Sequence, residues 1–66
     1  MIFMAFNETI KKLRLDKVIS LSDAARDLGV KPSTLHCWES GKRMPRPETL
    51  KKVAEYFEVT VDFLLK

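Results

Sequence analysis

The sequence predicts an all-α fold, a compact bundle of five short helices. Two observations predict it: apolar residues recur at helical spacing along the chain, and Gly or Pro stands at most borders between the periodic segments. No part of the chain needs a strand to account for its pattern. At 66 residues the chain needs nearly every large apolar residue for one core. We therefore expect a single domain, residues 1–66, in which residues 1–5 are a possible extra N-terminal stub.

The first helix is expected over residues 7–16, with Asn7 as its N-cap. Apolar residues of this segment repeat at i, i+4 and i+7, which is the spacing of one helix face. That inward face consists of Phe6, Ile10 and Leu13. Leu15 lies off this face, and we expect its side chain to be at least half exposed.

The second and third helices are bounded by recognisable capping residues. Ser20 and Asp23 have the spacing of a capping box, so the second helix is expected to begin after Ser20. Gly29 follows its last apolar residue, where a left-handed backbone ends a helix without a Cβ penalty. Pro32 suits the first turn of the third helix, which is expected to end at Gly41.

The fourth helix is expected over residues 48–57, after the extended segment MPRP. Its inward face has helical spacing and consists of Leu50, Val53, Ala54 and Phe57. Thr60 can cap a last short helix with the sequence VDFLLK.

Positive charge is concentrated in the middle of the chain. The net charge is +3, and residues 31–52 carry six Lys or Arg against two Glu. A basic cluster of this kind favours a polyanionic partner such as a nucleic acid.

Several classes of protein are disfavoured by the composition. No apolar run approaches the roughly 18–20 residues of a membrane span, and MIFMAF is too short for a signal-peptide core. A single Cys allows no internal disulfide and suits a reducing compartment, so we expect a cytoplasmic protein. One Cys and one His do not make a metal site, and no catalytic arrangement is visible. We expect no cofactor and no enzymatic activity.

Small residues stand where the second and third helices must approach each other. Ala24 and Ala25 allow two helices joined by a short turn to cross closely. The wedge between the helices is expected to be filled by Leu28, Val30, Leu35 and Trp38. At 100° per residue, the opposite side of the third helix carries Ser33, His36, Cys37 and Ser40. An apolar back with a small, uncharged polar front is unusual, because solvated helix faces are normally filled with Lys and Glu.

This pattern resembles the lambda-repressor-like, Cro-type helix-turn-helix family, also called the Xre family. Counted from Leu21, the family's preferred small and apolar positions are occupied by Ala24, Ala25, Leu28, Gly29, Val30, Leu35 and Trp38. The flanking segments FNETIKKLR, WESGKRMP and ETLKKVAEYFEVTVDFLL extend the resemblance over residues 6–65. The resemblance implies a five-helix bundle with a central helix-turn-helix at about residues 20–40, whose third helix lies in the major groove of DNA.

The resemblance also implies roles for individual residues. Bases are expected to be read by Lys31, Pro32, Ser33, His36 and Cys37. Phosphates are expected to be contacted by Ser20, Leu21, Ser40, Lys42 and Arg43, in agreement with the preference of phosphates for helix N-termini and basic loops. Arg14 and Glu39 are expected to form a partly buried ion pair.

The sequence departs from the family pattern at three places. Leu21 replaces the usual Gln, which leaves only its backbone N–H for a phosphate. Val18 replaces a Gly at the end of the first helix, and a β-branched residue is a poor left-handed cap, so we expect that turn to close differently. The base-reading positions Pro32, Ser33 and Cys37 make no bidentate base contact, so either DNA shape contributes to recognition or specificity is modest.

The sequence favours a sequence-specific regulator of transcription, in particular a repressor that binds a palindromic operator as a homodimer. Dimerisation is expected through residues 59–65, from Val59 onwards. Phe63 in this region, together with the N-terminal apolar stub MIFM, would form an exposed apolar patch. Met4 is an alternative start to Met1. The alternative function is a protein-interaction module on the same fold, either an antitoxin or an antagonist of another repressor. A redox role for Cys37 is a further open alternative.

Overall fold

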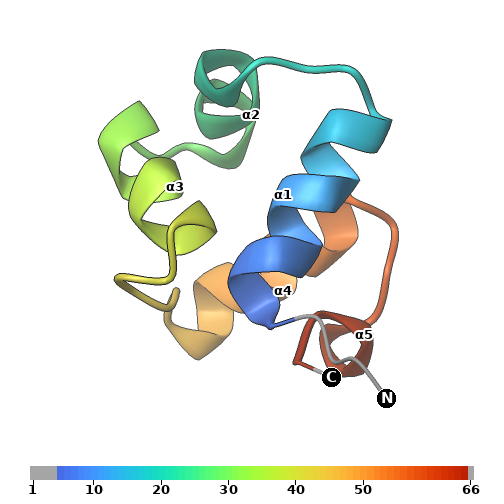
Figure 1. The fold of residues 1–66 in the computed structure, drawn as a ribbon. Coiled ribbons are helices and arrows are strands. Elements are labelled where there is room, and N and C mark those ends of the chain that lie inside the picture. Colours follow the sequence, from blue (N-terminus) through green and yellow to red (C-terminus); the bar gives the residue numbers. More distant parts are fainter. Residues whose placement is uncertain (1–4, 66) are drawn as a thin grey trace.

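The computed structural model describes residues 5–65 and contains five α-helices in that range (Figure 1). They are α1 (Phe6–Asp16), α2 (Leu21–Leu28), α3 (Pro32–Glu39), α4 (Pro47–Tyr56) and α5 (Val61–Leu65). Residues 5–65 contain no strand, so the predicted all-α class and the five-helix order are confirmed. The predictions about the stub MIFM and its contact with Phe63 lie outside the described residues.

The start of α1 differs from the prediction. Ala5, not Asn7, is the N-cap, and its backbone N–H donates to Glu8 Oε1 at 3.3 Å. The Glu8 side chain thus accepts from the N–H of the cap residue itself, and Asn7 lies inside the first turn rather than at the cap.

The predicted N-caps of α2 and α5, Ser20 and Thr60, are confirmed. Ser20 Oγ accepts from the backbone N–H of Asp23 at 3.0 Å, and Thr60 Oγ1 accepts from that of Phe63 at 3.0 Å. The Asp23 carboxylate does not complete the capping box. It instead pairs with Arg26, at 3.3 Å between Oδ1 and Nη1.

The helices enclose one core to which every helix contributes. α1 packs against α3 and α5, α2 packs against α3 and α4, and α4 packs against α5. The buried apolar residues are Phe6, Ile10, Ala24, Ala25, Leu28, Leu35, Trp38, Leu50, Val53, Ala54, Phe57 and Leu64. Ala24 and Ala25 are fully buried where α2 meets its neighbours, as their small size predicts. The core therefore holds α2 and α3 in a fixed relation.

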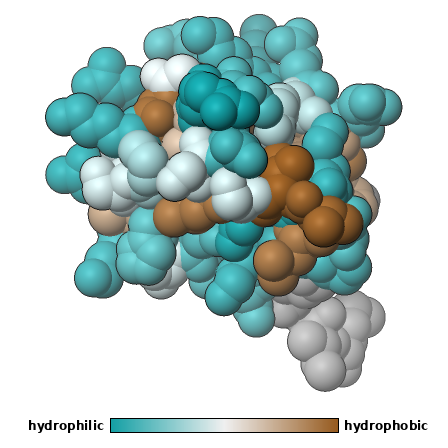
Figure 2. All heavy atoms as spheres, turned by 90° about the horizontal axis from the view of Figure 1, so that it is seen from above, coloured by the Kyte–Doolittle hydropathy of each residue, from teal (hydrophilic) through white to brown (hydrophobic). Residues whose placement is uncertain are grey.

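The surface is largely polar but interrupted by apolar residues. On the face drawn in Figure 2, a brown cluster right of the centre and smaller brown areas to its left stand among hydrophilic residues. The exposed large apolar residues of the described chain are Leu15, Val18, Met44, Phe63 and Leu65. Leu15 is 55% exposed, which confirms its predicted place off the inner face of α1. No helix within residues 5–65 has the length and apolar character needed to cross a membrane.

The turn between α1 and α2 contradicts the prediction made for Val18. Val18 has φ of 57°, so it adopts the left-handed conformation that a Gly would take there. Its N–H donates to Leu15 O at 3.0 Å, and the next N–H, of Ile19, donates to Arg14 O at 3.4 Å. Arg14 Nη1 also donates to Ile19 O at 2.9 Å. These contacts fix the turn despite a steric penalty of roughly 1–2 kcal/mol for a left-handed residue that carries a Cβ.

Val18→Gly should therefore raise the free energy of unfolding by about 0.5–1 kcal/mol, because relief of the Cβ clash exceeds the extra chain entropy of Gly. The Val18 side chain is 88% exposed, so its removal sacrifices little burial. Urea denaturation measures the change. Val18→Ala is the control, since it keeps the Cβ and should not gain stability. Equal stabilisation by both variants would show that the backbone at Val18 is unstrained.

Candidate nucleic-acid interface

The outer face of α3 presents the residues predicted to read bases. Lys31 is the N-cap of α3, and Pro32 begins the helix with a ring that suits its first turn. The exposed residues on this side are Lys31, Pro32, Ser33 and His36, and Cys37 is half-buried. Leu35 and Trp38 lie on the opposite side and are buried in the core. The structure therefore brings the five predicted residues to one surface backed by a rigid apolar face.

The N-terminus of α2 forms one border of this interface. Ser20 is exposed, and because its Oγ acts as acceptor toward Asp23, the hydroxyl hydrogen remains available to a phosphate. The side chain of Leu21 is half-buried and packs against the core. Leu21 can thus offer only its backbone N–H, one of the first-turn donors that have no partner within a helix.

The loop after α3 forms the other border and is tied to one carbonyl of the helix. Cys37 O accepts from Lys42 N at 3.0 Å, from Arg43 N at 3.3 Å and from Ser40 Oγ at 3.2 Å. The backbone donors of Lys42 and Arg43 are therefore occupied, and these residues can contact phosphate only through their exposed side chains. The hydroxyl hydrogen of Ser40 is also occupied, which makes Ser40 the weakest of the predicted phosphate contacts.

One further exposed cation, Arg46, belongs to the basic cluster of residues 31–52 but was given no contact with DNA. Arg46 is the exposed N-cap of α4 and follows the loop that carries Lys42 and Arg43. It was treated as part of an extended linker. The signal that could have identified it is the Arg-Pro pair, because Pro at the first helical position places Arg46 at a helix N-terminus.

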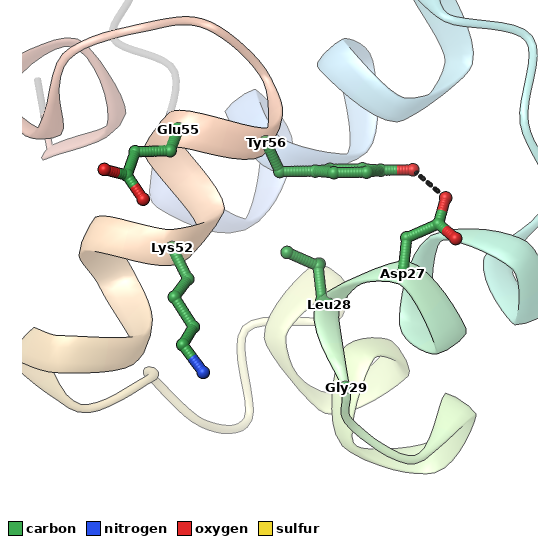
Figure 3. Close-up of a pocket in the computed structure, with 6 residues that line it drawn as sticks. All are labelled: Asp27, Leu28, Gly29, Lys52, Glu55 and Tyr56. Carbon is green, nitrogen blue, oxygen red and sulfur yellow. Dashed lines mark hydrogen bonds between the residues drawn. The ribbon is translucent and has the colours of Figure 1, made fainter.

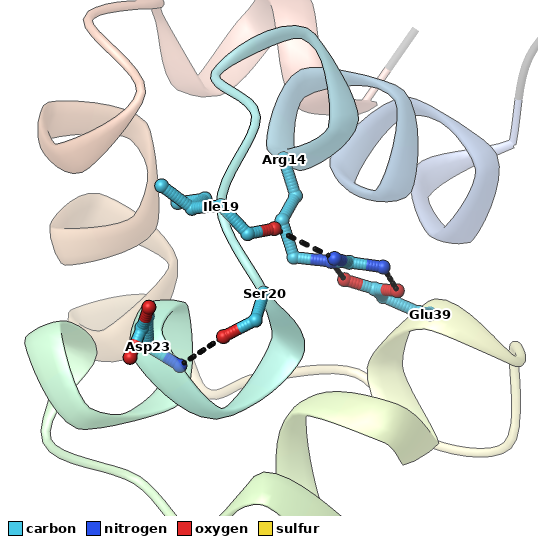
Figure 4. Close-up of polar contacts among 5 residues, drawn as sticks. All are labelled: Arg14, Ile19, Ser20, Asp23 and Glu39. Atoms are coloured by element: carbon cyan, nitrogen blue, oxygen red, sulfur yellow. Dashed lines mark hydrogen bonds and ion pairs between the residues drawn. The ribbon is translucent and has the colours of Figure 1, made fainter.

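The predicted ion pair between Arg14 and Glu39 is present and joins α1 to the end of α3 (Figure 4). Arg14 Nε lies 2.6 Å from Glu39 Oε2, and Nη2 donates to Oε1 at 3.1 Å. The two side chains are 12% and 6% exposed. The third nitrogen of Arg14 donates to Ile19 O, directly before Ser20. One guanidinium group therefore fixes the end of α3 relative to the start of α2.

A shallow groove outside the predicted interface separates α2 from α4 (Figure 3). It has a volume of about 470 Å³ and is lined by Asp27, Leu28, Gly29, Lys52, Glu55 and Tyr56. Tyr56 OH donates to Asp27 Oδ2 at 2.7 Å, and the Lys17 ammonium lies 5.0 Å from the centre of the Tyr56 ring. Burial, together with this hydrogen bond, raises the pKa of Tyr56 to about 12. The groove contains a structural contact between helices that the sequence did not reveal.

Tyr56→Phe should lower the free energy of unfolding by about 0.5–1 kcal/mol at pH 7, the usual worth of one hydrogen bond near the surface. The pKa of Tyr56 is higher in the folded state than the ordinary value of 10, so the stabilisation is complete below pH 10 and is lost as pH rises toward 12. Urea denaturation of both proteins at pH 7 and pH 11 measures this. If Tyr56→Phe lost the same stability at pH 7 and pH 11, the raised pKa of Tyr56 in the folded state would be contradicted.

Comparison with known proteins places the chain in a family. The sequence profile of the family described as Helix-turn-helix, the Xre or lambda-repressor-like type, matches residues 10–64. The chain belongs to this helix-turn-helix family. The fold of the P22 c2 repressor protein, solved in complex with a synthetic operator, superimposes with a TM-score of 0.92 over 97% of both chains at 23% identity. The solution structure of the LexA SOS-response repressor from Eubacterium rectale superimposes with a TM-score of 0.88 over 92% of this chain and 65% of that chain, at 24% identity.

Three transcriptional regulators are similar in sequence. The transcriptional activator BcrR of Enterococcus faecalis is 40% identical over 94% of this chain and 30% of its own length. The uncharacterised regulator YqaE of Bacillus subtilis is 33% identical over 92% of this chain and 53% of its own length. The cryptic phage repressor RstR of Vibrio cholerae is 29% identical over 85% of this chain and 50% of its own length. The chain thus spans about half or less of the length of these relatives.

Proposed function

We propose that the protein is a sequence-specific, double-stranded DNA-binding regulator of transcription that inserts α3 into the major groove. The observation that carries the proposal is the surface of α3, small and uncharged at its centre and bordered by Ser20 on one side and by Lys42 and Arg43 on the other. Phosphate donors on both sides of a groove-sized helix match the way helix-turn-helix proteins bind duplex DNA. Membership of the family and the names of its relatives support the same function.

In this proposal one group of residues contacts bases and another contacts phosphates. Bases are read by Lys31, Pro32, Ser33, His36 and Cys37, and phosphates are contacted by Ser20, Leu21, Ser40, Lys42 and Arg43. Lys31 at the N-cap of α3 and His36 within α3 are the residues on this surface able to donate to a base with a long side chain. Pro32 and Cys37 are suited to a thymine methyl group. A face with so few donors also depends on the shape of the DNA.

We propose further that the protein acts as a homodimer on a palindromic operator. Phe63 and Leu65 are 51% and 52% exposed on α5, whereas Leu64 between them is fully buried. The dimer contact of residues 59–65 would therefore use the two outer side chains, and half-sites would lie about one DNA turn apart. A repressor is the simpler role, since occupancy of the groove blocks other proteins without any further partner. We place it in the cytoplasm and assign it no cofactor and no enzymatic activity.

Selection of random duplex DNA by the purified protein tests this function, with the affinity of the selected sequence measured at 50 and 200 mM salt. A palindromic consensus with steep salt dependence would support a dimeric reader of the major groove. Salt-dependent binding without a consensus would leave a DNA-binding protein that recognises mainly shape. No binding at either salt concentration would reject the proposal and favour the alternative, an antitoxin or an antagonist of another repressor.

A further inference from the structure

The first turn of α1 lies against the loop that follows α3. Gly41 has φ of 82°, in the left-handed region. A Cβ on residue 41 would lie 3.4 Å from Asn7 Cγ, 3.5 Å from Nδ2 and 3.7 Å from Oδ1. The carboxamide of Asn7 therefore covers the side of Gly41 where other residues carry their side chain.

Residues 41–43, which we call the phosphate loop, are held from a second direction by α3. Lys42 N and Arg43 N both donate to Cys37 O, whereas the side chains of Lys42 and Arg43 are exposed. These bonds, together with a longer one from Gly41 N to Trp38 O at 3.4 Å, hold the loop against α3. Gly41 still has the widest choice of backbone conformations of any residue and no side chain of its own to pack. Asn7 supplies that packing from α1.

We propose that Asn7 is a positioning residue for the phosphate loop, an inference that rests on the proposed DNA-binding function. By covering Gly41, Asn7 restricts the loop to the conformation in which Lys42 and Arg43 project from the end of α3. Truncation of Asn7 opens space beside Gly41 and increases the freedom of the loop. DNA binding must then order Lys42 and Arg43, and ordering of long side chains weakens affinity.

The free protein offers a first test, which does not depend on DNA. Asn7→Ala should speed hydrogen exchange of the Lys42 and Arg43 amides, which donate to Cys37 O, with little change at Leu64 N in α5. Unchanged exchange at Lys42 and Arg43 would overturn the proposal even if the protein binds DNA. Because this measurement uses the protein alone, its failure is distinct from a failure of the proposed function.

DNA affinity offers the second test, on the sequence obtained by selection. Asn7→Ala should weaken binding about fivefold, in line with the ordering of one or two long side chains. In a Lys42→Ala, Arg43→Ala background the same change should have no further effect, because the residues that Asn7 positions are absent. A full additional loss in that background would mean that Asn7 contacts DNA or acts elsewhere, and would overturn the proposal.

Asn7→Leu is the matched control. Leu has nearly the shape of Asn and can cover Gly41, but it has no polar group with which to contact a phosphate. Positioning by packing predicts that Asn7→Leu retains most of the affinity lost in Asn7→Ala. An equal loss in the two variants, with unchanged thermal stability, would assign Asn7 a direct polar contact instead.

Discussion

Glu39→Ala should lower the free energy of unfolding by about 3 kcal/mol, because removal of one partner leaves the other charge of a buried pair uncompensated. The Arg14 side chain is 12% exposed and would keep a single partner, Ile19 O. A folded chain of this length has a total stability of roughly 3–10 kcal/mol. The variant is therefore expected to keep roughly 0–7 kcal/mol of stability, and any loss of DNA binding should follow from this loss of stability.

Urea denaturation followed by circular dichroism measures this loss. Val18→Gly provides a more stable background in which the variant remains folded at zero denaturant. Glu39→Gln is the matched control, since it keeps the shape and one acceptor for the Arg14 guanidinium, and it should lose less stability than Glu39→Ala. An unchanged melting temperature in Glu39→Ala would mean that the contact contributes nothing to stability.

The helix borders could be predicted where a residue's own chemistry fixes the backbone. Gly29 and Gly41 have the left-handed φ values expected at helix ends, and Pro32 starts α3. The helical period identified most core residues for the same reason, because residues that share a helix face are buried together. Leu13 and Val30 were expected inside but are only partly buried, and the fully buried Leu64 was not predicted. The ion pair of Arg14 and Glu39 is different. These residues are 25 positions apart, and their pairing was implied by family resemblance rather than by local sequence.

The errors occurred where a particular side-chain contact decides a local conformation. Val18 is a poor left-handed residue by itself, and the turn keeps it there because Arg14 binds the adjoining carbonyl of Ile19. The cap at Ala5 depends on a side chain that reaches back from Glu8. The contact of Asn7 with Gly41 joins α1 to the loop beyond α3, and no pattern within either segment indicates it.

These contacts relate the borders of the candidate interface to one another. Arg14 links the end of α3 to the residue before Ser20, whereas Cys37 O binds the backbone of Lys42 and Arg43. One border is therefore tied to α3 through Arg14 of α1, and the other is tied directly to the Cys37 carbonyl of α3. A helix that enters the groove would carry its phosphate contacts with it as one rigid unit, so base reading and phosphate binding need no separate adjustment.

Replacement of both Lys42 and Arg43 by Ala should weaken binding to all DNA sequences alike. If each side chain neutralises one phosphate, removal of two contacts lowers the slope of log affinity against log salt by about 1.8. If the variant and the unchanged protein bind DNA equally at 1 M salt, this change in slope makes the variant's affinity about sixtyfold lower at 0.1 M salt and about twentyfold lower at 0.2 M salt. Titration of the selected operator and of a scrambled duplex at several salt concentrations measures both quantities. The fold itself should be unaffected, because both side chains are exposed.

Ser33→Ala and Cys37→Ala are the matched comparison, since they alter the outer face of α3 without removing charge. Each should leave the salt slope unchanged and shift the preferred sequence, because a side chain in the groove contacts base edges rather than phosphates. The ratio of operator to scrambled affinity is the deciding quantity. It should stay constant in the Lys42 and Arg43 variants and change in the Ser33 and Cys37 variants. Equal effects of all four residues on both duplexes would refute this division between phosphate contact and base reading, and would indicate that α3 does not occupy the groove.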